Sequence, residues 1–415
     1  MKTRASCLEV ANSVLLSLRS NKSFHLEEFQ QTQAQLVSKT KKMLTEDWVP
    51  QLGRELRSAL SEVSKGWFNL EETDREVYNM SKFSNFMTLV SCMMIDAARQ
   101  CVLNNFKLFD DFITDLAPNS VEVKSPTEVI SDFPKDSTGA MIMPLFEIDM
   151  AIEKETITDP KGVESEVDKI CYGINPVLFK EACTTILSSI VDAVRSIPII
   201  EPRVLPDMFR NVVLTLSTIN EDEEQLVEHK SHVVAHLDAA IDVLQQYLAT
   251  YDEYTEFIRL DNAKFIEQLN TDNPSLDQCR QMIKVHQEAM DELHKNIPKR
   301  EVVGLFAVNV TSIRNHLISK RKTLIKAILD YVSKTAKNQF KKLFNEYRTI
   351  ESKITALPTK IEELDQTRQY IATVPNLTDK LHSRVVDSMK YYDFIDEYCH
   401  ALPNEYFNMK WNVYG

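Results

Sequence analysis

Glycine is scarce in this chain of 415 residues, which contains only 7, about a quarter of ordinary usage. Turns that require a positive φ must therefore be few, and helices are favoured. No two glycines have the spacing of a phosphate-binding loop or of a dinucleotide-binding fingerprint, and neither a GxSxG nor an HExxH motif occurs. The sequence accordingly predicts no catalytic residues, no cofactor-binding residues and no metal ligands, and it indicates that this chain is not an enzyme.

Long apolar runs and paired cysteine motifs are lacking as well. No uninterrupted apolar run approaches the roughly 18 residues of a transmembrane helix, so we expect no contact with a membrane. Glu9 and Asn12 interrupt the apolar stretch near the N-terminus, so we expect no signal peptide. The seven cysteines are an odd number without any CxxC pair, which is typical of buried thiols in a reducing compartment.

Basic residues are fewer than acidic residues in this chain. The chain contains 48 Lys and Arg against 61 Asp and Glu, which gives a formal net charge of -13. Such a protein repels phosphate backbones, so nucleic acid is not an expected partner. Hydrophobic residues make up 43% of the chain, enough to form packed cores. The length suits two or three domains.

Apolar residues that recur every three or four positions predict helices over most of the chain. A wide apolar arc between Phe83 and Val102 predicts a buried helix. Prolines and serines interrupt the pattern after residue 117. The alternation in Met143–Met150 then predicts a strand, with Glu155–Thr158 as its hairpin partner.

Further along the chain, a polar connection over residues 159–175 leads into a second helix. This helix is predicted to begin at Pro176, because proline suits the first helical turn, and to end near Pro198. Val302–Val310 is a short apolar run that predicts another strand.

A long helix is predicted to begin near Thr311 and to end at Pro358. Its apolar residues step alternately four and three positions apart, as in a coiled-coil seam. We expect this seam to be buried, with residues 361–371 folding back as its partner and a separate final helix over residues 381–395. The seam residues are Ala336, Phe340, Leu343, Tyr347, Ile350, Ile354 and Leu357.

Together these patterns predict a mainly α protein, an elongated array of long antiparallel helical hairpins with two or three short β-strands. We expect three segments. Residues 1–117 form an N-terminal helical segment, residues 118–220 form a strand hairpin followed by a helix, and residues 221–415 form a long-helix segment.

Three clusters of polar residues could in principle bind a metal ion or another cation. His229, His232 and His236 share one helix face that could hold zinc, but no fourth ligand is evident, and a polar helix face is the simpler interpretation. The acidic pair Asp110–Asp111 and the run Glu221–Glu224 are interpreted as helix starts or solvated faces and not as cation sites.

A basic run and a methionine-rich stretch are interpreted in the same way. Lys320–Lys322 could meet an acidic partner, but a solvated face of the long helix is the simpler interpretation. The methionines, Met87, Met93 and Met94, are interpreted as adaptable core and not as a docking groove. The residues alone therefore favour a scaffold, and they leave a motor tail and a subunit of a tethering complex as alternatives.

Passages near the C-terminus resemble the tail of dynein heavy chains. Asn296–Asn309 is similar to the family's stretch in which a proline precedes a Gly-Leu-Phe strand, and Leu357–Leu364 resembles its Pro-Thr pair before a second helix. Tyr406–Gly415 is similar to the aromatic passage that precedes the Trp-Pro at the start of the family's linker.

Upstream passages resemble the same family in the same order. Pro144–Asp149 is similar to a strand hairpin of the axonemal heavy chains, Val191–Pro198 to the helix end that follows it, and Phe83–Phe112 to the helix pair before it. Gly162–Tyr172 departs from the pattern, and residues 1–60 match no part of it.

The resemblance implies a parent chain that is an ATP-dependent, minus-end-directed microtubule motor of cilia and flagella. Its AAA+ ring, stalk and microtubule-binding domain would lie downstream. This chain would be the non-catalytic stem that anchors the motor to an axonemal doublet through docking proteins and transmits force from the linker. The implied partners are dynein intermediate and light chains, or actin and centrin in an inner arm, which the resemblance favours.

Two other functions stay open from the residues. A helical-rod subunit of a tethering or scaffold complex predicts the same helices but no motor downstream. A helical enzyme would require that the isolated chain bind a nucleotide or a metal.

Overall fold

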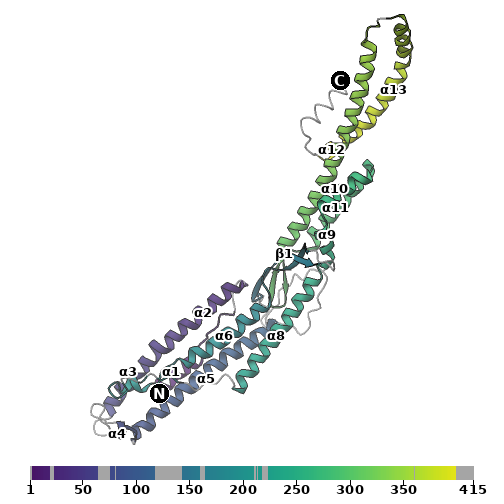
Figure 1. Ribbon diagram of the computed structural model, residues 1–415. Coiled ribbons are helices and arrows are strands. Elements are labelled where there is room, and N and C mark those ends of the chain that lie inside the picture. Colours follow the sequence, from purple (N-terminus) through teal and green to yellow (C-terminus); the bar gives the residue numbers. More distant parts are fainter. Residues whose placement is uncertain are drawn as a thin grey trace. The chain divides into compact units, whose positions relative to one another are not determined.

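The computed structural model describes most of the chain in helices and strands (Figure 1). The described residues are 2–18, 23–63, 75–79, 81–116, 143–158, 164–209, 212, 214–216, 223–358 and 360–398. Contacts divide the chain into two compact units. The first unit comprises Met1–Glu155, Lys169–Glu253 and Pro298–Ile313, and the second comprises Thr156–Asp168, Tyr254–Ile297 and Arg314–Gly415.

Helices dominate the first unit. In chain order they are α1 (Lys2–Ala11), α2 (Leu26–Lys42), the π-helical stretch η1 (Met43–Trp48), α3 (Val49–Val63), α4 (Arg75–Asn79), α5 (Lys82–Leu116), α6 (Val177–Arg195), α7 (Glu201–Val204) and α8 (Glu224–Ala249). The wide apolar arc predicted a buried helix where α5 lies, and the structure confirms it. Helix α5 packs against α1, α6 and α8. The expected mainly α fold with a few short strands is also confirmed.

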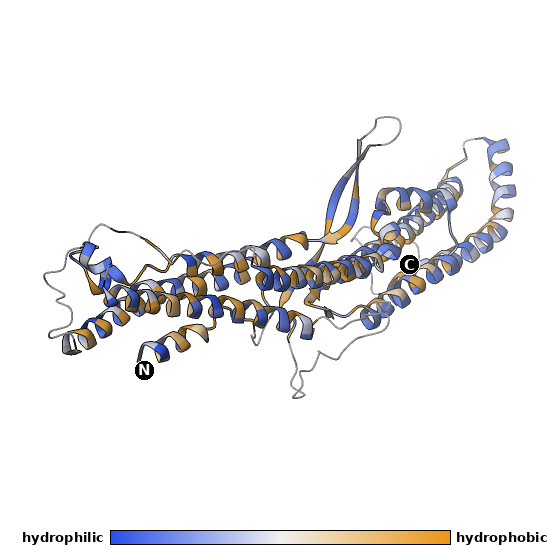
Figure 2. Cartoon of the chain, turned by 90° about the horizontal axis from the view of Figure 1, so that it is seen from below, coloured by the Kyte–Doolittle hydropathy of each residue, from blue (hydrophilic) through white to orange (hydrophobic). Residues whose placement is uncertain are grey.

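Helix α5 is the one described helix whose length and composition would suffice to cross a membrane. The core helix of a soluble protein passes the same test. Here Met87, Met94 and Phe109 are among the residues of α5 that lie in the core of the first unit. Figure 2 shows apolar and polar residues alternating along the helices.

A small sheet lies within the helical framework, with the strand order β2-β1-β4-β3. Its strands are β1 (Phe146–Thr158), β2 (Glu164–Tyr172), β3 (Arg300–Val303) and β4 (Phe306–Asn309). Strand β1 pairs in parallel with β4, and β3 pairs antiparallel with β4. An aromatic cluster connects the sheet to the helices: the ring of Phe146 lies 5.1 Å from that of Phe29 on α2, 4.8 Å from that of Phe179 on α6 and 5.4 Å from that of Phe306.

The structure corrects two strand predictions. Glu155–Thr158 is not a hairpin partner but the continuation of β1, and the neighbouring strand is β2, in the stretch predicted to be a polar connection. Strand β2 escaped prediction because only Ile170 and Tyr172 among its described side chains are buried. Val302–Val310 is not one strand but the hairpin β3–β4, because Gly304, at φ 56°, reverses the chain between them.

The described residues of the second unit form the helices α9 (Thr255–Arg259), α10 (Asn262–Asp272), α11 (Leu276–Asn296) and α13 (Ile361–Glu397). It also contains α12 (Thr311–Thr355) from Arg314 onward, and a 3₁₀ turn, η2 (Asp252–Tyr254), precedes α9. A Ser275–Gln278 capping box begins α11. Asn273 ends α10 in the left-handed conformation, at φ 44°. Helix α12 ends at Thr355, as Pro358 predicts.

The C-terminal hairpin differs from the prediction in two respects. Helix α13 continues through Pro375, so residues 361–371 and 381–395 form one helix and not two. The seam of α12 is buried at Phe340 and Leu343, but Tyr347 is 61% exposed and Ile354 is 40% exposed. The ring that contacts Phe340 is Tyr392, at 4.9 Å between centroids, so the expectation that residues 361–371 bury the seam is wrong.

Candidate functional site

The histidines of α8 face α5 within the first unit. His229 Nδ1 lies 2.8 Å from Asp110 Oδ2, and His232 Nδ1 lies 3.5 Å from the same oxygen. His236 Nε2 is 3.4 Å from the hydroxyl of Thr114. Asp110 is buried. Part of the polar face predicted for α8 therefore contacts α5, although the His232 side chain is 55% exposed. Asp110 is a partner of two imidazoles and not a solvated carboxylate.

No group of three His, Cys, Asp or Glu side chains in the described part of the chain is arranged to hold a metal ion. The acidic run of the sequence is described only from Glu223 onward, since Glu221 and Asp222 lie outside the described residues. Glu223 accepts a hydrogen bond from Arg99 Nε at 2.6 Å, and Glu224 is the first residue of α8. Glu223 and Glu224 thus mark a helix start, as interpreted from the sequence.

The basic run on α12 is used inside the second unit. Lys320 donates a hydrogen bond to the carbonyl of Ile258, and the guanidinium of Arg321 lies 4.3 Å from the ring centroid of Phe257. Burial lowers the pKa of both cations. Lys322 is exposed. The solvated face interpreted from the sequence is therefore limited to Lys322, because its two neighbours hold α9 against α12.

The methionines of α5 behave as predicted. Met87 and Met94 are fully buried in the core of the first unit, and Met93 is half-buried. Thioethers fill irregular gaps between helices, which suits these positions. They form part of the helical core of the first unit.

A buried carboxylate network, which the sequence did not predict, joins α8 to β3. Tyr247 donates a hydrogen bond to Glu301 Oε2 at 2.5 Å, and its hydroxyl lies 2.8 Å from that of Tyr251. Burial raises the pKa of Glu301, and it raises the pKa of Tyr251 to about 12. The hydrogen bond from Tyr247 satisfies this buried carboxylate, so its arrangement is that of a structural contact.

A second polar arrangement holds the irregular segment 12–18 between α2 and α5. The amide of Asn105 accepts a hydrogen bond from the backbone of Leu15 at 2.7 Å and donates one to the carbonyl of Ser13 at 2.8 Å. The amide of Gln33 accepts from Ser17 N at 3.0 Å and donates to Ser17 O at 2.7 Å. Both amides are buried, so the segment is fixed in place although it forms neither helix nor strand.

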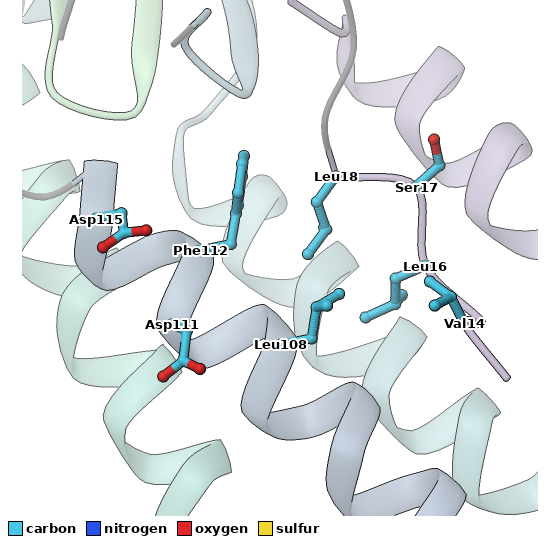
Figure 3. A pocket seen from close by; sticks show the side chains of 8 residues that line it. All are labelled: Val14, Leu16, Ser17, Leu18, Leu108, Asp111, Phe112 and Asp115. Atoms are coloured by element: carbon cyan, nitrogen blue, oxygen red, sulfur yellow. The ribbon is translucent and has the colours of Figure 1, made fainter. Parts of the chain in front are cut away.

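A groove lies between this segment and the C-terminal end of α5 (Figure 3). Its volume of about 530 Å³ is in the range of pockets that accept small ligands or peptide side chains. The side chains of Leu16, Leu18 and Leu108 point toward one another across it. The residues that line it are Val14, Leu16, Ser17, Leu18, Leu108, Asp111, Phe112 and Asp115.

The groove is apolar inside and acidic along α5. Phe112 is buried, whereas Val14 is 62% exposed and Leu108 is 41% exposed. Asp111 and Asp115 have no ion-pair partner among the described residues. Sequence reasoning missed this groove because its two sides lie about ninety positions apart in the chain, and only the fold brings them together.

Comparisons with known proteins give one consistent result. The chain is 28% identical over 410 residues to dynein axonemal heavy chain 1 of Mus musculus and equally to that of Homo sapiens, and 25% identical over 450 positions to that of Rattus norvegicus. Each match covers 99% of this chain but only 9% of the relative. No protein-family model matches the chain.

The relatives are axonemal by name, in agreement with the axonemal location that the resemblance implies. Because the alignments include nearly every residue, they extend to the N-terminal stretch in which the motifs gave no match. The resemblance predicted from the residues is therefore confirmed, because the chain is similar along nearly its whole length to a segment of the axonemal dynein heavy chains.

Proposed function

We propose that this chain is a non-catalytic stem segment of an axonemal dynein heavy chain, which anchors the motor to its doublet microtubule and transmits force from the linker. The observation that carries the proposal is the similarity of 99% of the chain to 9% of a heavy chain. The parent protein would be the ATP-dependent, minus-end-directed motor of ciliary and flagellar movement. An inner-arm position is part of the proposal.

The lengths of the helices support a mechanical role. Helix α12 has 45 residues, which corresponds to roughly 70 Å at 1.5 Å per residue. Helix α13 has 37 residues and returns along it: the ion pair between Glu346 and Arg384 and the hydrogen bond between Gln339 and Ser388 fix the two helices antiparallel. A paired helix resists bending because its backbone hydrogen bonds run along the axis, and the scarcity of glycine removes compliant points.

The proposed partners are the accessory chains of an axonemal dynein, its intermediate and light chains or actin and centrin, together with docking proteins of the doublet. The network at Glu301, the contact between His229 and Asp110, and the cations Lys320 and Arg321 of α12 are all used within the fold. Exposed apolar residues are thus the better candidates for binding such chains.

Deletion of this segment from its parent heavy chain tests the proposal. An in-frame deletion in ciliated cells should leave the motor ring able to hydrolyse ATP while the heavy chain is lost from isolated axonemes. Normal incorporation of the shortened heavy chain into axonemes would contradict the anchoring role. A reading frame with no motor domain downstream would favour the tethering-complex alternative instead.

The isolated 415-residue chain should neither bind nor hydrolyse ATP. The reason is that no stretch of the sequence supplies the glycine-rich backbone that cradles a phosphate chain. Isothermal titration with Mg-ATP is the measurement. A saturable binding isotherm would contradict the non-catalytic assignment.

A further inference from the structure

The groove between segment 12–18 and α5 has the features of a docking site for a peptide. One wall of the groove is segment 12–18. Asn105 and Gln33 fix the backbone of this segment through four hydrogen bonds to Ser13, Leu15 and Ser17. A preorganised wall lowers the entropic cost of binding. Leu16, Leu18 and Phe112 line the interior and are already buried, so an apolar side chain that enters meets an apolar surface.

The two carboxylates that line the groove favour a basic partner. Asp111 and Asp115 are four residues apart and hence on the same face of α5, where like charges repel each other. They also lie in the last turns of a helix that ends at Leu116 and has no basic residue in its last turn. The helix dipole places further negative charge at that end. A bound cation would reduce both the repulsion between the two carboxylates and their unfavourable interaction with the helix dipole.

We propose that this groove binds a basic, amphipathic peptide segment of a partner protein, with an apolar side chain between α5 and segment 12–18 and a Lys or Arg beside it at Asp111 and Asp115. The inference rests on the proposed function in one respect, since the partner would be one of the accessory or docking chains of the axonemal stem. An acidic peptide or a nucleotide does not fit, because it would meet the two carboxylates and the dipole at close range.

The probe is a phage-displayed library of random 12-residue peptides, selected on the complete 415-residue chain. Selected peptides are synthesised with a fluorescent label and titrated by fluorescence polarisation. We expect enrichment of peptides that combine apolar residues with Lys or Arg. Their affinity should fall as salt is raised, because the proposed contact is partly electrostatic.

Matched variants locate the binding site. The double variant Asp111→Asn/Asp115→Asn should weaken binding by roughly tenfold, and Leu108→Ser should also weaken it. The control is Glu224→Gln/Glu228→Gln, which removes two exposed carboxylates with the same four-residue spacing on α8 and should leave the affinity unchanged. The Asn variant should be at least as thermally stable as the unmodified chain, since it relieves repulsion, so weaker binding cannot be attributed to unfolding.

Three results would overturn the proposal: no peptide with saturable binding, equal affinity for the unmodified chain and the Asn double variant, or an equal loss in the α8 control. Each of these leaves the deletion experiment on the parent heavy chain unaffected. The docking proposal and the stem proposal therefore fail independently.

Discussion

The two ends of the α12–α13 hairpin have apolar residues at the same spacing, but only one end is buried. Near Phe340, the rings of Phe340 and Tyr392 pack edge to face, and Cys279 and Ile283 of α11 complete a core. Toward the turn of the hairpin, Leu357 is 90% exposed and Ile361 is 87% exposed.

The difference between the two ends lies in the number of helices. The buried end has a third layer, supplied by Leu269 of α10 and by α11, whereas only α12 and α13 among the described helices extend beyond that layer. Two helices can cover only part of each other's apolar stripes. A 4-3 spacing therefore predicts a helix with an apolar stripe, but the burial of that stripe depends on which other elements reach it.

The largest expected effect is at the buried end. Phe340→Ala should lower the free energy of unfolding by about 3–5 kcal/mol, because it removes a fully buried ring and leaves a cavity beside Tyr392. Urea unfolding followed by circular dichroism is the measurement. The matched control is Tyr347→Ala, two turns further along the same seam, which should change the value by no more than about 0.5 kcal/mol. Equal losses at the two positions would contradict the comparison.

A smaller effect is expected from the ion pair that holds the exposed half. Arg384 donates hydrogen bonds of 2.5 and 3.0 Å to the two carboxylate oxygens of Glu346, and both side chains are about half exposed. Arg384→Gln should cost about 0.2–1 kcal/mol at low salt and less at high salt. Thermal unfolding at two salt concentrations measures this.

The same pair predicts a pH dependence. The hydrogen bond from Arg384 and its charge lower the pKa of Glu346 below its ordinary value of 4.5. A carboxyl group with a depressed pKa in the folded state contributes stability that is fully present above that ordinary value and is lost as the pH falls through the folded pKa. The difference in stability between the unmodified chain and Arg384→Gln should therefore be present at pH 7 and disappear at strongly acidic pH. A difference that grew on acidification would contradict the assignment.

The smallest expected effect on stability is at the turn of the hairpin. Leu357→Ser/Ile361→Ser should leave the free energy of unfolding within about 0.5 kcal/mol, because both side chains are almost fully exposed. Chemical denaturation of the double variant is the measurement. A loss comparable with that of Phe340→Ala would show that these residues are buried in solution and that the two ends do not differ.

The sequence predicted local features of the fold well. The end of α12 before Pro358, the buried arc of α5 and the start of α6 at Pro176 follow from patterns within one helix. Prediction from the sequence failed where the structure of a segment depends on another element packed beside it. Strand β2 is largely polar and forms beside β1, and Pro375 is accommodated inside α13.

The candidate sites, too, could be predicted only where they depend on residues of a single helix. The histidines were correctly placed on one face of α8, but Asp110, the partner of His229 and His232, is more than one hundred positions away in the chain. The groove combines residues from segment 12–18 with residues 108–115, and neither stretch carries a recognisable motif. Charge within α5 was the available signal, since two carboxylates near the end of a helix oppose its dipole and invite a cationic partner.

The proposed role of this chain in force transmission is tested most directly by breaking α12 between its buried half and its exposed half. Lys342→Pro removes a backbone hydrogen bond of the helix between Phe340 and Leu343 and introduces a clash with the preceding turn, at a cost of about 3 kcal/mol or more. The measurement is microtubule gliding by the parent heavy chain that carries this change, together with its basal ATPase activity. The account predicts slower gliding with basal ATP hydrolysis largely unchanged, because the ring would be separate from the stem. Normal gliding velocity and force with the helix demonstrably broken would contradict it.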